Sequence, residues 1–464
     1  MLGVLIMKKL NNADVMPRWL PDDQVVMEGW HPDWVKSLVM AELRVESATP
    51  EGTFASAIRV LDHYEEMGVN ALWLTPIQDK GETGNGYSNM GLHTISPHLT
   101  GKNNYVEGWQ VFKEFVDAAH ARNIRVYIDA IVWGTVKESP LVVDHPDWYA
   151  GKLEVWGGYK FNWHNQVFRD WYMQTAIDIV MKTGLDGYRV DLEPFVTGHT
   201  FFAQLRRELL ARGRKISIFA ECTSEREEAY DFDEQITNED PERWHMHSMF
   251  TERHNIVDAI KTGKGHGTIY AQDNGKGGMA RFYCLCLCCH DNLIPSIKGD
   301  RIVIGYQALF APYIPLWFLG EEWNNPIHPD CGMFNNVIEW ELLDDPSHAA
   351  FYEDVKKMIR LKRIYGDILD YAPDNHREAN ICAVKSNCGL QAYARYLDGR
   401  ALLILPNIAE TEQTLTAVIP VEEAGLTAIG TVREVLHDAP VKVDGTNISV
   451  TVPLRDMAVI LVDR

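Results

Sequence analysis

The stretch GYRVD, at residues 187–191, decides the fold prediction. Tyr188 and Val190 suit a strand packed inside a sheet, whereas Arg189 and Asp191 are charged. Side chains two residues apart in a strand point to the same side, so Arg189 and Asp191 face one side together. They also stand where the apolar run ends. The stretch therefore predicts a buried strand that carries a polar pair at its carboxyl end.

Strand-like and helical stretches alternate on both sides of GYRVD. SLVMAEL (37–43) precedes the amphipathic stretch 54–68, ALWLTP (71–76) follows, and the pattern continues to the last long helical stretch, 349–366. Such alternation predicts parallel strands joined by helical crossovers, as in doubly wound sheets and (β/α)8 barrels. No glycine-rich phosphate loop follows an early strand, which disfavours a dinucleotide-binding sheet. The number of units favours the barrel.

Two regions break this rhythm. Residues 133–165 are rich in Trp, Gly, Pro and His and predict a short inserted subdomain, called subdomain B here, after the third strand. From about residue 376, short β-like runs separated by turn residues predict an antiparallel C-terminal domain. We therefore expect an α/β fold: a (β/α)8 TIM barrel over 1–375 that includes the insertion, and a β-sandwich over 376–464.

Composition excludes several classes of function. The chain has 464 residues, a net charge of −21 and a pI near 5.2, which argues against binding to nucleic acid or to anionic membranes. No apolar run approaches the roughly 20 residues that a membrane helix needs. The N-terminus lacks the charge order of a secretory signal. We expect a cytoplasmic protein, and the sequence assigns no oligomeric state.

The cysteines form neither a disulfide framework nor an expected metal site. Eight cysteines in a chain of this length are few, and four of them lie in CLCLCC (284–289). Alternating Cys and Leu indicates a buried strand, in which a free thiol behaves as a small hydrophobe. Unpaired thiols fit a reducing compartment. We predict no metal ligands here.

Several predicted strands end on a polar group. Asp129 comes late in VYIDA, Glu221 ends ISIFAE, and His290 with Asp291 ends LCLCCHD. Taken singly, a carboxylate such as Asp191 or Glu221 at a strand end is more often a helix cap or a turn residue. In a (β/α)8 barrel, however, all of these ends converge on the face where active sites are built. Convergence favours the functional interpretation.

Carboxylates with an arginine and a histidine suit glycoside hydrolysis. That reaction requires one carboxylate and one carboxylic acid across the sugar ring. Arg189 favours the ionised form of Asp191, as a nucleophile requires, and the apolar run before Glu221 suits a general acid. Metal hydrolases and aldolases of the same fold use His clusters or a Lys at strand ends, and neither is found.

The sequence resembles the alpha-amylase family, glycoside hydrolase family 13, over roughly residues 37–460. The resemblance rests on motifs in family order: GVNALWLTPI (68–77), GYRVD (187–191), FAE (219–221), HDN (290–292) and IPLWFLGEEW (314–323). It implies a barrel, an inserted subdomain and a C-terminal β domain. It also implies Asp191 as nucleophile and Glu221 as acid/base, with Asp291 stabilising the transition state and His290 binding the sugar.

One motif departs from the family pattern. The third-strand motif normally runs Asp-x-x-x-Asn-His, but here it is DAIVWG: Asp129 is kept, while Trp133 and Gly134 replace the Asn and the His. The replaced Asn often binds structural calcium, so calcium is doubtful and no cofactor is expected. Trp133 supplies either an aromatic wall of the sugar site or packing at the barrel rim. Tyr87 in GYSNMG resembles the aromatic residue that stacks on the sugar.

Three functions follow from these residues. The first is a retaining alpha-glycosidase acting on alpha-glucans or related alpha-linked oligosaccharides by double displacement. The second is a transglycosylase or glycosyl-isomerising enzyme of the same family, since the catalytic residues are shared. The third is a non-catalytic carbohydrate-binding relative. The retained Asp191, Glu221 and Asp291 favour the two enzymes.

Overall fold

A computed structural model of the protein describes residues 33–80, 86–153, 157–191, 199–220, 246–250, 284–286, 290, 301–309, 314–326, 338–370 and 381–464. The chain divides into two compact units. The first holds residues 41–65 and 69–249, and the second holds residues 250–464 with the short stretches 36–40 and 66–68. Each unit is described by itself.

The first unit is built on parallel strands. They are β1 (Met40–Leu43), β2 (Ala71–Leu74), β3 (Arg125–Ile131), β7 (Gly187–Asp191), β8 (Ser217–Ala220) and β9 (Met246–Phe250). From β2 onward they pair in the order β2-β3-β7-β8-β9, all parallel. Strands of a parallel sheet that is covered by helices are expected to be nearly continuous apolar runs, and β2 and β3 are. A charged residue inside them is therefore an exception that needs a cause.

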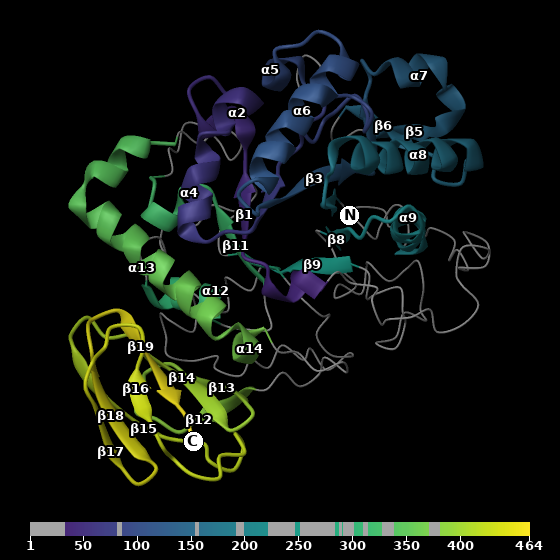
Figure 1. The fold of residues 1–464 in the computed structure, drawn as a ribbon. Coiled ribbons are helices and arrows are strands. Elements are labelled where there is room, and N and C mark those ends of the chain that lie inside the picture. The colour runs from purple at the N-terminus through teal and green to yellow at the C-terminus, as the bar shows by residue number, and fades with distance from the viewer. Residues whose placement is uncertain are drawn as a thin grey trace, which may run out of the picture. The chain divides into compact units, whose positions relative to one another are not determined.

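Helices connect these strands, and local capping signals set where they begin and end. They are α2 (Val45–Ala48), α3 (Phe54–Ala57), α4 (Val60–Met67), α5 (Pro97–Thr100), α6 (Tyr105–His120), α8 (Gln166–Thr183) and α9 (His199–Ala211), after the short η1 (Asp33–Ser37). The side chain of Asn104 caps the start of α6, and that of Asn165 caps the start of α8. Gly184, in the left-handed conformation, ends α8. Figure 1 shows α8 beside the inserted sheet, where Phe168 of this helix packs against Phe161.

A small antiparallel sheet follows β3. It contains β4 (Gly134–Val136), β5 (Tyr149–Leu153) and β6 (Gly158–Phe161) in the order β4-β6-β5, with α7 (Pro140–Asp144) and η2 (Pro146–Trp148) between its strands. Gly134 is required by a close approach, since a Cβ there would lie 1.8 Å from the carbonyl oxygen of Tyr159. The glycine that replaces a histidine in the family motif therefore has a packing cause in this chain.

The second unit begins with the remaining strands and helices of the barrel type. They are the parallel pair β10 (Cys284–Cys286) and β11 (Ile314–Phe318), with α12 (Arg301–Leu309), η6 (Glu321–Trp323), η7 (Trp340–Asp344), α13 (Pro346–Ile364) and α14 (Gly366–Leu369). The order of the parallel sheet is β1-β11-β10-β9-β8-β7-β3-β2, which is that of a closed eight-stranded barrel. Cys284–Cys286 form a strand, as CLCLCC predicts, while Cys288 and Cys289 lie outside the described residues.

Two antiparallel sheets close the chain. The larger has the order β12-β13-β14-β19-β16 and the smaller the order β15-β18-β17. Their strands are β12 (Ile381–Val384), β13 (Ala392–Leu397), β14 (Arg400–Asn407), β15 (Gln413–Val418), β16 (Val432–Glu434), β17 (Val441–Asp444), β18 (Asn447–Val452) and β19 (Asp456–Val462). Residues from both sheets, such as Leu403 and Val450, share one buried core, which makes a sandwich (Figure 1).

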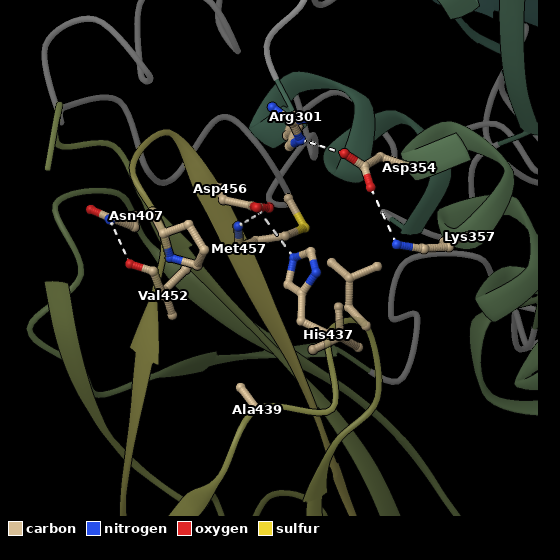
Figure 2. A network of polar contacts seen from close by, with 12 residues as sticks. Arg301, Asp354, Lys357, Asn407, His437, Ala439, Val452, Asp456 and Met457 are labelled. Atoms are coloured by element: carbon tan, nitrogen blue, oxygen red, sulfur yellow. Dashed lines mark hydrogen bonds and ion pairs between the residues drawn. The ribbon is translucent and has the colours of Figure 1, made fainter. Parts of the chain in front are cut away.

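Polar contacts join elements within the second unit. Arg301 of α12 pairs with Asp354 of α13 at 2.5 Å, and His437 pairs with Asp456 of β19 at 3.2 Å (Figure 2). The hydrogen bond with Asp456 raises the pKa of His437, with a further contribution from the charge of Asp354. The charge of His437 therefore interacts with Asp456 of β19 and with Asp354 of α13.

Candidate active site

The register of β3 against β7 brings the predicted site residues of the first unit together. Asp129 pairs with Arg189, and Ile131 pairs with Asp191. Because the two strands are parallel and in this register, their carboxyl ends lie side by side. Side chains that share a face of neighbouring strands are then within contact distance.

One guanidinium nitrogen serves two carboxylates. Nη1 of Arg189 lies 2.9 Å from Oδ1 of Asp129 and 2.6 Å from Oδ1 of Asp191. The side chains of Arg189 and Asp129 are completely buried, and that of Asp191 is 9% exposed. Such short, charge-assisted hydrogen bonds in a water-poor setting favour the ionised form of both carboxyl groups. Asp191 is thus the member of the trio with access to solvent.

The other oxygen of Asp129 is also occupied. Oδ2 accepts hydrogen bonds from the indole nitrogen of Trp73 at 2.9 Å and from the hydroxyl of Tyr87 at 3.2 Å. The rings of these two residues also lie against the Arg189 guanidinium, 4.9 and 5.7 Å from their centroids. With both oxygens engaged by protein donors, Asp129 orients Arg189 and Tyr87.

Tyr87 is held as a neutral hydrogen-bond donor. Burial, followed by the charge of Asp129, holds the pKa of the Tyr87 phenol well above its ordinary value, and the charges of Glu42 and Asp191 act in the same direction. The phenol therefore keeps its proton, and the hydroxyl donates to Asp129. The sequence pattern alone does not indicate this role, because Tyr87 and Asp129 are 42 residues apart.

Trp133 is packed and hydrogen-bonded at the edge of the site. Its indole nitrogen donates to the main-chain oxygen of Tyr87 at 3.1 Å, and a Cβ on Gly158 would lie 2.6 Å from its ring. The side chain is 4% exposed. It thereby fixes the segment that carries Tyr87. An indole offers no oxygen ligand, so the residues at this position do not fit a calcium ion.

The remaining predicted site residues are not brought into this group by the described structure. Glu221 and Asp291 lie outside the described residues, and β8 ends at Ala220, directly before Glu221. His290 is described and is buried, within the second unit. Among the described side chains, no group of three or more His, Cys, Asp or Glu residues gathers as a metal site would require.

Two further polar residues of the first unit escaped the sequence analysis. Glu42 of β1 is fully buried, and its charge acts on Tyr87. Gln78, four residues beyond the end of β2, is 2% exposed and donates from Nε2 to the main-chain oxygen of Asp129 at 3.3 Å. The signal for Glu42 was present, because it is a single acidic residue inside the apolar run SLVMAEL. The sequence held no comparable signal for Gln78.

The fold and the trio at the ends of β3 and β7 define a barrel protein of the (β/α)8 class with a carboxylate–arginine site. The family model described as alpha amylase, catalytic domain, matches residues 39–145. A malto-oligosyltrehalose trehalohydrolase of Mycobacterium tuberculosis is 31% identical over 396 residues, which cover 73% of this chain and 67% of the relative. The chain belongs to the alpha-amylase family.

Other known proteins agree with this assignment. A cyclomaltodextrinase of a Bacillus species is 28% identical over 404 residues, covering 78% of this chain and 67% of that one. The crystal structure of an alpha-amylase of Geobacillus thermoleovorans, complexed with acarbose, superposes with a TM-score of 0.73 at 16% identity and covers 92% of this chain. At that identity the likeness shows the fold alone. The predicted fold class, the family and the class of enzyme, an amylase-type glycoside hydrolase, are confirmed.

No helix within the described residues combines the length and the apolar character needed to cross a membrane.

Proposed function

We propose that the protein is a retaining alpha-glycosidase that cleaves alpha-linked oligosaccharides of glucose by double displacement. One observation carries the proposal. Asp191 stands at the carboxyl end of a barrel strand, 2.6 Å from a buried arginine and slightly open to solvent. A carboxylate that is held ionised and remains accessible is what the nucleophile of a retaining mechanism requires.

The proposal gives each residue a step. Asp191 attacks the anomeric carbon, while Glu221 protonates the oxygen of the leaving sugar. The carboxylate gains a bond to carbon, and the leaving group departs with the proton. Glu221, now ionised, takes a proton from water, and the hydroxyl attacks the anomeric carbon to release Asp191. Asp291 and His290 bind the sugar at the point of cleavage.

Tyr87, Arg189 and Asp129 position this chemistry. Arg189 holds Asp191 and Asp129, and Asp129 in turn fixes the hydroxyl of Tyr87. The phenol ring of Tyr87 then offers an apolar surface to the sugar bound above Asp191. Trp133 holds the Tyr87 segment through a hydrogen bond to its main-chain oxygen. The proposal assigns no cofactor, because protein carboxyl groups supply both the nucleophile and the acid.

Substrate class comes from the named activities of the relatives. Cyclomaltodextrin and malto-oligosyltrehalose are both alpha-linked oligomers of glucose, and the name trehalohydrolase describes cleavage by water. A relative named trehalose synthase/amylase, 24% identical over 36% of this chain, favours transfer to a second sugar as the alternative outcome. Long polysaccharides, which occupy many sugar-binding subsites of an enzyme, are the less favoured substrates.

The proposal also places the enzyme in the cytoplasm. Cys382 and Cys388, the two thiols of the C-terminal sandwich, are both free. Free thiols persist in a reducing compartment. The partner in this proposal is the carbohydrate substrate, and neither nucleic acid nor membrane takes part.

The test is proton NMR of the purified protein with maltotriose, a cyclomaltodextrin, a malto-oligosyltrehalose, trehalose and sucrose. Release of the alpha anomer first, lost in Asp191→Asn and in Glu221→Gln, is the expected result. New linkages without net hydrolysis would replace the hydrolase by the transglycosylase. Binding of sugars without any turnover would refute the enzyme and favour a binding protein.

A further inference from the structure

Gln78 has an unusual environment for a glutamine. Its side chain is 2% exposed, and it lies just after β2, in the first unit, beside the end of β3. Its Nε2 donates to the main-chain oxygen of Asp129 at 3.3 Å. Because that oxygen can only accept, the nitrogen of the amide must face it, and the orientation of the amide is fixed.

The oxygen of the same amide is unused. Within the described part of the chain, Oε1 of Gln78 has no hydrogen-bond partner. A buried acceptor without a donor is unfavourable, because the desolvation of that oxygen is not compensated. Native proteins tolerate such an atom where a bound molecule satisfies it.

The segment that carries Gln78 is held rigidly. The main-chain oxygen of Ile77 accepts from Ser96 at 2.9 Å, and that of Asp79 accepts from Met90 at 2.7 Å. The main-chain nitrogen of Asp79 also donates to the hydroxyl of Thr94 at 3.1 Å. These bonds fix the main chain on both sides of Gln78, and the bond from its Nε2 to Asp129 holds the amide itself. The acceptor is preorganised.

Three donors of the site are already bonded to one carboxylate. The indole of Trp73, the hydroxyl of Tyr87 and Nη1 of Arg189 all bond to the Asp129 carboxylate. None of these three donors bonds to Oε1 of Gln78, so a bound molecule with a donor of its own would satisfy that oxygen. A bound glucose unit carries several hydroxyl groups, which are neutral donors, and a neutral amide oxygen accepts from them without the cost of burying another charge.

We infer that Gln78 is a substrate-positioning residue, whose Oε1 accepts a hydrogen bond from one hydroxyl of the sugar bound beside Asp129 and Asp191. The inference rests on the proposed function and adds to it a specificity contact. A site that hydrogen-bonds one hydroxyl discriminates against the sugar that lacks it, because the buried acceptor is then left unpaired.

The experiment compares wild type with Gln78→Met, which keeps the length of the side chain and removes both the acceptor Oε1 and the donation from Nε2 to Asp129. The deoxy analogues, and not the size of the loss, therefore test the acceptor. A matched control is Gln110→Met, at an exposed position of α6. We would measure kcat and KM with maltotriose and with maltotriose analogues that each lack one hydroxyl, together with the Tm of each protein. Loss of one neutral hydrogen bond predicts a fall of roughly two- to tenfold in kcat/KM for Gln78→Met.

Three results support the inference together. The Tm of Gln78→Met falls by no more than the few degrees expected from losing the bond to Asp129, Gln110→Met has wild-type kinetics, and one deoxy analogue is turned over equally by wild type and Gln78→Met. That analogue identifies the hydroxyl. A lower Tm with unchanged kcat/KM would overturn the inference and make Gln78 structural, and so would equal losses for every analogue. A wild-type protein inert toward all these sugars would instead refute the proposed function.

Discussion

Removing the shared arginine should cost more stability than removing any surface charge of this protein. In Arg189→Met, the buried carboxylate of Asp129 and the nearly buried carboxylate of Asp191 lose the cation that lies 2.9 and 2.6 Å away. Breaking a buried ion pair by deleting one partner typically costs about 3–5 kcal/mol. Asp129 keeps its bonds from Trp73 and Tyr87, so we expect a loss of about 3–4 kcal/mol, toward the lower end of that range.

A matched surface variant calibrates this value. Lys113 and Asp117 form an ion pair of similar length, 2.5 Å, on the exposed side of α6. Exposed pairs one helical turn apart contribute about 0.3–0.5 kcal/mol, so Lys113→Met should change the free energy of unfolding by no more than that. Both variants replace a basic residue that pairs with aspartate by methionine, but Arg189 is buried and serves two carboxylates, whereas Lys113 is exposed and serves one.

The assay is urea-induced unfolding at pH 7, followed by tryptophan fluorescence and circular dichroism. A third variant, Arg189→Met with Asp129→Asn, removes one of the two stranded charges and should recover at least about 1 kcal/mol of the loss, since neighbouring groups in one network couple. A loss in Arg189→Met no larger than in Lys113→Met would refute our reasoning. So would a double variant that is no more stable than Arg189→Met.

Three further predictions follow from other parts of the structure. Because the pKa of His437 is raised, its pairing with Asp456 stabilises the fold below about pH 6.5, and this contribution is lost as the pH rises through the raised pKa. The variant His437→Gln should therefore lower the Tm at pH 6 but not at pH 9. Equal losses of Tm at both pH values would contradict this. Gly134→Ala places a methyl group against the carbonyl of Tyr159 and should lower the Tm by several degrees, and an unchanged Tm would show that β4 shifts freely. Because Trp133 occupies the position of a calcium ligand, dialysis against EDTA should leave the Tm and the rate of maltotriose cleavage unchanged, and a loss restored by calcium alone would disprove the assignment.

Sequence reasoning reached the parts of the fold that local patterns determine. The alternation of apolar and charged residues in GYRVD was enough to place Arg189 and Asp191 on one side of a strand, and the two side chains are in contact. The short β-like runs that begin near residue 376 predicted an antiparallel domain, and two antiparallel sheets follow there. The predicted domain limits and catalytic roles stay predictions.

Non-local contacts were beyond the same reasoning. The donation from Trp133 to Tyr87 joins residues 46 positions apart, and the approach of Tyr159 to Gly134 joins two strands of the inserted sheet. Neither pairing has a local signature. Gln78 was missed for a related reason, since a glutamine beyond a strand is ordinary until the burial of its oxygen is known.

Because Arg189 shares one nitrogen between two carboxylates, the net charge of the site changes during the proposed reaction. In the resting protein one guanidinium faces two carboxylates, so the trio carries one excess negative charge. A sugar that develops positive charge at its anomeric carbon is drawn to such a pocket. Once the Asp191 oxygen is esterified, the excess disappears and Arg189 is matched by Asp129 alone. The attraction thus ends when the covalent bond forms, and hydrolysis of the ester, which frees Asp191, restores it for the next turnover.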